Sequence, residues 1–194
     1  MSVKFTSDLH FFHENICNYS DRLTPDATVK EHADWLVALW NAEVHPTDTI
    51  YHLGDFSFGN YTDTAELLKK LNGYKIFIKG IHDKEGHLRV FKESKLIQEY
   101  ALYLEIEILD TKAVLFHFPI TAWHRQGYGS IHLHGHFHGS LKDTGGLILD
   151  VGIDSAKKIY GKHKFFTEED VLQYMQSRVP NIPDGHKDQT YKAY

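Results

Sequence analysis

Cysteine and long apolar runs are nearly absent from this chain of 194 residues. The single cysteine, Cys17, excludes an intramolecular disulfide and any metal site built from several cysteines, and it fits a reducing compartment. No stretch approaches the roughly 18 apolar residues of a membrane span. The N-terminus has no basic segment leading into an apolar run, so we expect no signal peptide. These absences predict a cytoplasmic protein with no membrane partner.

Excess positive charge is absent as well. Lys and Arg total 21 against 26 Asp and Glu, which leaves a net charge of −5. This balance argues against a broad surface that coats duplex nucleic acid, although it leaves room for a local anion site. Histidine is abundant, because its 15 residues exceed the 14 glycines, and glycine is ordinarily among the commonest residues. Since histidine is the usual imidazole metal ligand and proton shuttle, the excess points toward metal or acid–base chemistry.

Short apolar runs alternate with helical patterns over the first 80 residues, which predicts a β-α-β-α-β order with parallel strands. We expect strands over residues 3–7, 49–53 and 74–79, a helix opened by a Thr28–Glu31 capping box, and a second helix over 62–71. The later chain predicts a hairpin of strands 100–109 and 113–118, strands over 130–134 and 147–151, and a last helix from about 167 to 178. We predict one domain over residues 1–178 and a flexible tail over 179–194.

Residues that bind metals follow one predicted strand after another. They stand in five segments: Asp8-Leu9-His10, Gly54-Asp55, Gly80-Ile81-His82-Asp83, His117, and His136-Phe137-His138. Each segment alone is a weak signal, since Asp-x-His arises by chance and Gly-Asp is usually a turn. Open α/β sheets bind ligands at the carboxyl ends of their strands, so the fold would bring all five to one place. Asp and His are ligands suited to Zn, Mn, Fe or Ni, and the combination therefore predicts a metal site.

This order of motifs resembles the pattern of the calcineurin-like metallophosphoesterases, from Asp8 to His138. Residues 7–16 and 147–154 resemble the small, often phage-encoded, members of that family. The last 40 residues or so carry none of its motifs. The resemblance implies an α/β fold, a sandwich of two mixed β-sheets flanked by helices.

The resemblance also implies a dinuclear site that holds two divalent metal ions, with Mn favoured over Fe, Ni or Zn. Asp8, His10 and His138 would hold the first ion, Asp55 would bridge both ions, and His117 and His136 would hold the second. A hydroxide between the ions would be the nucleophile. His82 would protonate the leaving oxygen, and Asp83 would orient His82 through a hydrogen bond.

The implied activity is metal-dependent hydrolysis of a phosphate ester. Because the chain has no cap domain over the metals, we favour a phosphodiester such as a cyclic nucleotide or a nucleic-acid end. A small phosphomonoester is an alternative substrate. A catalytically impaired module that binds metal or phosphate is an alternative function. The sequence does not predict an oligomeric state.

Ile81 departs from the family pattern, which has asparagine at this position. That asparagine ordinarily gives a side-chain oxygen to the second metal, and isoleucine has no donor atom. Three interpretations follow: a weaker second metal, a site that works with one metal on an easy substrate, or an inactive form, natural or engineered. We favour active chemistry with a compromised second site, because the other motifs are intact.

Four further residues stand near the motifs and, with Ile81, are candidate substrate contacts. His13 lies three residues after His10 and would reach the same site if that segment turns helically. Arg22 carries a guanidinium suited to phosphate recognition. Trp123 and His124 follow the His117 segment and would wall the cleft, or simply pack. The strand histidines His52, His132 and His134 are predicted to be structural, although His134 would also suit the orientation of a metal ligand.

Overall fold

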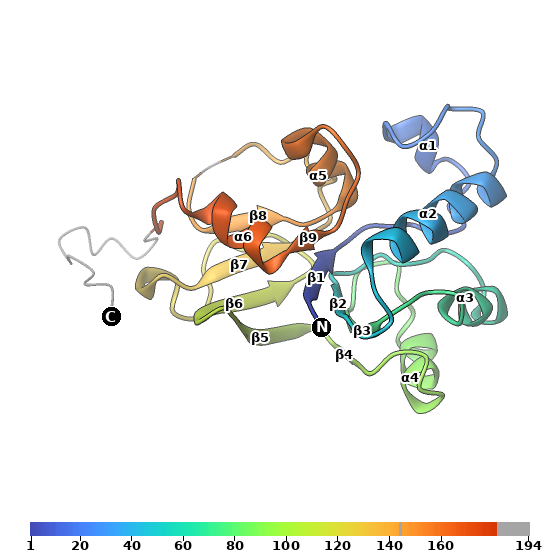
Figure 1. The fold of residues 1–194 in the computed structure, drawn as a ribbon, viewed down its shortest axis with the longest axis horizontal. Helices are drawn as coiled ribbons and strands as arrows, with labels where there is room; N and C mark the ends of the chain where they lie inside the picture. Colours follow the sequence, from blue (N-terminus) through green and yellow to red (C-terminus); the bar gives the residue numbers. More distant parts are fainter. Residues whose placement is uncertain (144, 182–194) are drawn as a thin grey trace.

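Two mixed β-sheets form the centre of the protein in this computed structural model, which describes residues 1–143 and 145–181 (Figure 1). The first sheet has the order β4-β3-β2-β1-β9, with β1 at Val3–Thr6, β2 at Thr49–His52, β3 at Tyr74–Ile78, β4 at Glu99–Ala101 and β9 at Phe166–Thr167. The second has the order β5-β6-β7-β8, with β5 at Tyr103–Ile108, β6 at Thr111–Phe116, β7 at Ile131–His134 and β8 at Ile148–Asp150. Both are mixed, because β9 runs antiparallel to β1 and β5 antiparallel to β6. The predicted fold class is confirmed.

Helices flank these sheets. They are α1 at Ile16–Tyr19, α2 at Val29–Glu43, α3 at Tyr61–Leu68, α4 at Glu85–Glu93, α5 at Ile153–Tyr160 and α6 at Glu168–Met175. The predicted capping box at the start of α2 is confirmed, since the Glu31 amide donates to Thr28 Oγ1 at 3.2 Å and the Thr28 amide donates to Glu31 Oε2 at 2.8 Å. No helix within residues 1–143 and 145–181 is both long and apolar enough to cross a membrane.

The core divides into two layers on either side of the first sheet. Neighbouring residues of a strand point to opposite faces, so Ile50 of β2 packs with α2, α3 and α4, whereas Tyr51 packs toward the second sheet. Figure 1 shows α2, α3 and α4 on the side of the first sheet away from the second. The first sheet is therefore covered on both faces, which explains why apolar residues of its strands point to both sides.

The predicted strand over residues 100–109 is wrong as one element. It breaks at Leu102, which is 59% exposed, and the two pieces join different sheets as β4 and β5. The hairpin turn also comes earlier than predicted, at Leu109 and Asp110, whose φ angles are 43° and 69°. Two consecutive left-handed residues match the twist of a tight hairpin, so β6 begins at Thr111.

The five motif segments follow the carboxyl ends of five strands, namely β1, β2, β3, β6 and β7. Strands β1, β2 and β3 are parallel, and so are β6, β7 and β8. The segments after β1 and β2 stay side by side beyond the sheet, because the amides of Asp8 and His10 donate to the carbonyls of Gly54 and Asp55 at 3.0 and 3.1 Å. One domain over residues 1–178 stays a prediction, and the predicted tail beyond residue 181 lies outside the described residues.

Candidate metal centre

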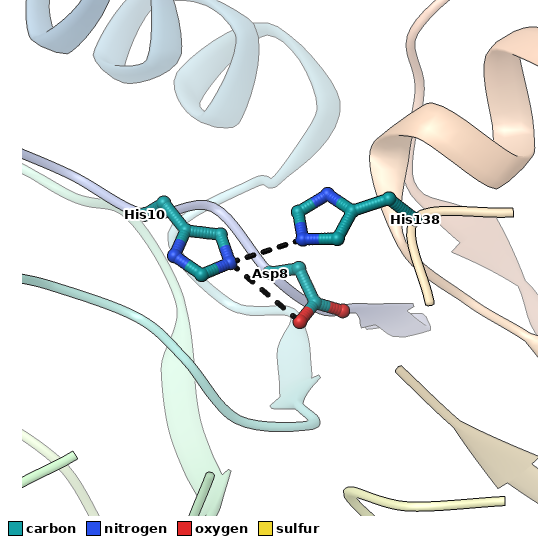
Figure 2. Close-up of side chains that lie close together, drawn as sticks. All are labelled: Asp8, His10 and His138. Atoms are coloured by element: carbon teal, nitrogen blue, oxygen red, sulfur yellow. Dashed lines mark hydrogen bonds and ion pairs between the residues drawn. The ribbon is translucent and has the colours of Figure 1, made fainter. Parts of the chain in front are cut away.

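The first group of clustered side chains, called here the first triad, consists of Asp8, His10 and His138 (Figure 2). Each offers one ligand atom, and these atoms all lie within 4.8 Å of one another. His10 Nε2 lies 3.2 Å from His138 Nε2 and 3.8 Å from Asp8 Oδ1. The loops after β1 and β7 therefore deliver two imidazole nitrogens and a carboxylate oxygen to one point.

The second triad consists of Asp55, His117 and His136, whose ligand atoms meet the same 4.8 Å limit. His117 is fully buried, and its Nδ1 lies 2.7 Å from the Leu53 carbonyl oxygen. That contact turns Nε2 toward Asp55, where it lies 3.4 Å from Oδ2. A ring nitrogen fixed by a backbone carbonyl leaves the other nitrogen available as a ligand.

Backbone conformation sets the triads apart from the rest of the chain. Five of their six members have positive φ, namely Asp8 (55°), His10 (52°), Asp55 (57°), His136 (74°) and His138 (50°). Only a few per cent of residues other than glycine adopt this region, and each instance costs about 1–3 kcal/mol. Such strain persists only when the surroundings over-determine it, and it concentrates at functional sites.

A glycine packs against the carboxylate of each triad. A Cβ at Gly135 would lie 1.8 Å from Ser7 Oγ and 2.4 Å from Asp8 Oδ2. A Cβ at Gly80 would lie 2.2 Å from Asp55 Oδ1 and 2.4 Å from the Asp55 amide nitrogen. Both motif glycines are therefore required by close packing of their backbone on a carboxylate.

The donor atoms fit divalent metal ions. Asp8 Oδ1 and His117 Nε2 are buried and have no hydrogen-bond partner among the described residues. Burial raises the pKa of Asp8, but the neighbouring His10 and His138 outweigh it and leave this pKa below its usual value. The pKa of Asp55 is also below its usual value, because the neighbouring His117 outweighs the effect of burial. Ionised carboxylates with imidazole nitrogens suit Mn, Fe, Ni or Zn.

A buried ion pair stands behind the first triad. Asp154 Oδ2 lies 2.6 Å from His138 Nδ1 and also accepts from Arg22 NH2 at 2.8 Å. Arg22 Nε donates to Asp154 Oδ1 at 3.0 Å, and its terminal nitrogens donate to the backbone carbonyls of Asp8 and Leu9 at 2.6 and 2.7 Å. A carboxylate on the far nitrogen of a ligand histidine fixes the ring and raises its basicity.

Arg22 is therefore not a substrate contact, and that prediction is wrong. Its side chain has no exposed surface, and its guanidinium donates hydrogen bonds to Asp154 and to two backbone carbonyls. Sequence reasoning gave Asp154 no role. A usable signal was present, since this aspartate follows the apolar strand β8 and Gly152, as Asp55 follows β2 and Gly54.

His82 lies on the wall beside the second triad. Its amide donates to Asp55 Oδ1 at 2.9 Å, and its ring Nε2 lies 3.8 Å from Asp55 Oδ2 with 43% of the side chain exposed. The predicted orientation of His82 by Asp83 is wrong. The Asp83 carboxylate instead accepts from the amides of Asp55 (2.9 Å), Phe56 (3.0 Å) and Gly80 (2.8 Å). Asp83 thereby ties the loops after β2 and β3 together, and it is 8% exposed.

Ile81 stands between two residues that hold Asp55. Gly80 packs against the Asp55 carboxylate, and the amide of His82 donates to it. The isoleucine is 54% exposed, which is unusual for an apolar β-branched side chain. It does not line the cavity described next, and its predicted substrate contact stays a prediction.

One cavity of about 760 Å³ borders both triads and is lined by His10, His82, His136 and His138. His13 also lines it, with its ring centroid 5.9 Å from that of His10, although residues 9–15 form turns rather than a helix. Its predicted substrate contact stays a prediction. Trp123 and His124 do not line it. Trp123 Nε1 donates to the Ser130 carbonyl, and His124 pairs with Glu105, which agrees with the alternative that they pack. Their predicted substrate contact stays a prediction.

The strand histidines are buried among apolar groups. His132 contacts the carbonyls of Val114 and Phe118 through its two ring nitrogens, at 3.1 Å each. Burial lowers the pKa of His52 to about 3 and that of His134 to about 4. His134 Nδ1 lies 2.8 Å from the Gly135 carbonyl rather than from a triad member. The prediction that all three are structural is consistent with these positions.

The chain has relatives among proteins of archaea and phages. It is 36% identical over 143 residues to the uncharacterised protein MJ1445 of Methanocaldococcus jannaschii. The aligned segment covers 73% of this chain and 72% of MJ1445. It is 30% identical over 181 residues to the gene 66 protein of Mycobacterium phage D29, across 79% and 88% of the two chains. The chain therefore belongs to one family with these proteins. No protein-family profile matches it.

A solved structure has the same fold. The protein of unknown function AQ665 from Aquifex aeolicus superposes with a TM-score of 0.65 at 22% identity, over 89% of this chain and 98% of that one. Two phosphoesterases overlap less well. The first is a novel archaeal phosphodiesterase, with a TM-score of 0.47 at 18% identity over 86% of this chain and 98% of that one. The second is Yfce from E. coli, with a TM-score of 0.41 at 17% identity over 78% of this chain and 79% of that one. These overlaps are too weak to assign a function. The fold that this chain shares with the Aquifex protein is a sandwich of two mixed β-sheets flanked by helices.

Proposed function

We propose that the protein is a metal-dependent phosphoesterase that prefers phosphodiesters. The observation that carries this proposal is the meeting of two Asp–His–His triads at one cavity, with five of six members in strained backbone. Neither a packed core nor a solvated surface accounts for buried ligand atoms that have no hydrogen-bond partner among the described residues. The motif order that resembles the metallophosphoesterases supports the same chemistry.

The two triads would each hold a divalent ion, with Mn favoured and Asp55 available to both. Such ions would lower the pKa of bound water and offset the charge of phosphate oxygens. The side chains of the protein would position the phosphate and supply a proton. His10, His136 and His138 border the cavity in which a phosphate would lie, and His82 stands at its wall to hold the proton that the leaving oxygen takes.

The size of the cavity favours a diester over a monoester. Its volume of about 760 Å³ extends beyond the triads to α1 and α5, so a phosphate at the metals would have room for two substituents. A cyclic nucleotide or a nucleic-acid end would supply such a phosphodiester. The small monoester remains the alternative substrate.

Hydrolysis of bis-p-nitrophenyl phosphate and of p-nitrophenyl phosphate, each with Mn²⁺ and with EDTA, tests this proposal. We expect Mn²⁺-dependent turnover that is faster for the diester and is abolished by EDTA. His82→Ala should lower kcat by about 10²–10⁴-fold, as expected for loss of a general acid. His45→Ala, at an exposed position remote from the cavity, is the matched control. No turnover of either ester by metal-loaded protein would overturn the proposal.

A catalytically impaired metal- or phosphate-binding module is the second candidate. The observation that favours it is Ile81, because an exposed isoleucine stands where the resembled family supplies a ligand oxygen. Under this candidate the wild-type chain binds Mn²⁺ without turnover, and Ile81→Asn restores hydrolysis. Equal turnover by the wild type and Ile81→Asn would dismiss it.

A further inference from the structure

The cavity is not confined to the triads, because it also has lining residues on α1, α5 and the loop that leads into α3. The part away from the triads, called here the outer half, is bordered by α1, by the loop between β2 and α3 and by α5. Tyr19 on α1, Phe58 on that loop and Phe137 between the two motif histidines line it. Three segments far apart in the sequence thus place an aromatic ring next to the proposed phosphate position.

Two of these aromatic residues are exposed to solvent and could contact a ligand. Tyr19 is 76% exposed and Phe58 is 39% exposed. Phe58 packs on imidazoles, with centroid distances of 4.5 Å to His13 and 4.4 Å to His82, so it is fixed in place. Single exposed aromatic residues are ordinary, but rings grouped on the wall of a cavity mark a ligand site.

Two lysines of α5 supply positive charge to the same wall. Lys158 Nζ donates to the Gly139 carbonyl at 2.9 Å, which holds its ammonium beside the loop after β7. Lys157 lines the cavity one residue earlier. The acids that face them are Asp21, and Asp154, which is already paired with Arg22. The outer half is therefore cationic in a protein whose net charge is −5.

We propose that the outer half binds the nucleoside of a nucleotide ester, with the base against Tyr19 and Phe58 and a further phosphate against Lys157 and Lys158. The inference rests on the proposed function only for the location of the reacting phosphate. Aromatic side chains stack on any base, and lysine ammonium groups pair with phosphate oxygens. The outer half would thus recognise base and charge without reading a particular sequence.

Binding of 5′-AMP and of ribose 5-phosphate to the full-length, EDTA-treated protein tests the aromatic wall, followed by NMR titration. We expect AMP to bind roughly tenfold more tightly, within the range known for base stacking. Tyr19→Ala with Phe58→Ala should bring the two affinities together, and Tyr19→Phe should keep the difference. Tyr74→Ala, at a 47% exposed tyrosine remote from the cavity, is the matched control. Equal binding by the wild type, or an unchanged ratio in the double variant, overturns the proposal.

Adenosine 3′,5′-bisphosphate tests the cationic wall in the same way. The wild type should bind it more tightly than AMP, and Lys157→Ala should remove that gain, whereas Lys30→Ala at an exposed position of α2 should not. A gain that survives in Lys157→Ala overturns this part. Failure of the nucleotide site and failure of the enzyme are distinguishable. Turnover of bis-p-nitrophenyl phosphate without AMP discrimination rejects the nucleotide site alone, and discrimination without turnover rejects the hydrolase alone.

Discussion

The first triad is anchored from behind by charged side chains, whereas the second is held mainly by backbone groups. Asp154 and Arg22 fix His138 and the carbonyls of the Asp8 loop. In the second triad, a carbonyl contacts His117 and an amide donates to Asp55. Both triads share a glycine packed on the carboxylate and strained backbone at the ligands.

The difference indicates that the two sites are not equivalent. A buried ion pair that bonds to a ligand restricts that ligand more strongly than a single carbonyl does. The second triad also has Ile81 beside its carboxylate, where the resembled family has a donor. We therefore expect a tighter first metal site and a weaker second one, and the following variants test that order.

The largest effect is expected for Asp154→Asn. This change leaves the fully buried Arg22 guanidinium without its carboxylate, and the free energy of unfolding should fall by about 3–5 kcal/mol. Urea unfolding measures it, with Asp34→Asn on the surface as control. A loss under about 1 kcal/mol, the range of an exposed pair, would show that the anchor behind the first triad adds little.

Alanine at the two motif glycines perturbs the triads separately. Gly135→Ala pushes against Asp8 and Gly80→Ala against Asp55, and each should destabilise by about 1–3 kcal/mol through overpacking. Each should also weaken Mn²⁺ binding mainly at its own triad, as measured by calorimetry. Gly86→Ala in α4, where a Cβ meets nothing within 4 Å, should be neutral or slightly stabilising. Equal loss at both sites from either variant would contradict their independence.

Ile81→Asn should bring the second site closer to the first. An added oxygen ligand should tighten the weaker Mn²⁺ site by about tenfold, equivalent to ~1.4 kcal/mol, and leave the tighter site unchanged. Calorimetric titration of Mn²⁺ into the wild type and the variant measures this. His136→Ala and His138→Ala assign the two binding events to the second and first triads. Two equally tight sites in the wild type would refute the difference between the triads.

A pH slope in the metal-free protein is the last expected effect. Burial lowers the pKa of His117, but Asp55 and Asp8 outweigh it and raise this pKa from 6.5 to about 9. Its stabilising contribution is therefore complete below about pH 6.5 and is lost as the pH rises to about 9, at no more than ~1.4 kcal/mol per pH unit. Burial lowers the pKa of His10, so that residue contributes with the opposite sign.

Urea unfolding in EDTA between pH 6 and 9.5 measures this slope, and His117→Gln should flatten it. A wild type and a variant with parallel pH profiles would show that the protonated ring does not stabilise the fold.

Much of the site was predictable because local chemistry marks it. Apolar runs that stop at Asp or His define the strand ends, and parallel strands bring those ends together. The six triad residues were named in this way, and the structure brings them into two clusters. Asp154 follows the same rule after β8 and was missed, because its segment contains no histidine.

The sequence by itself determined which ligand types follow which strands, since hydrophobic periodicity and metal preference are local properties. Only the tertiary structure decided what stands behind them. Arg22 and Asp154 are 132 positions apart, and Asp83 is saturated by amides of its own and a neighbouring loop rather than by His82. A buried polar group pairs with whichever partners the packed fold places within hydrogen-bond distance, because leaving it unpaired costs free energy.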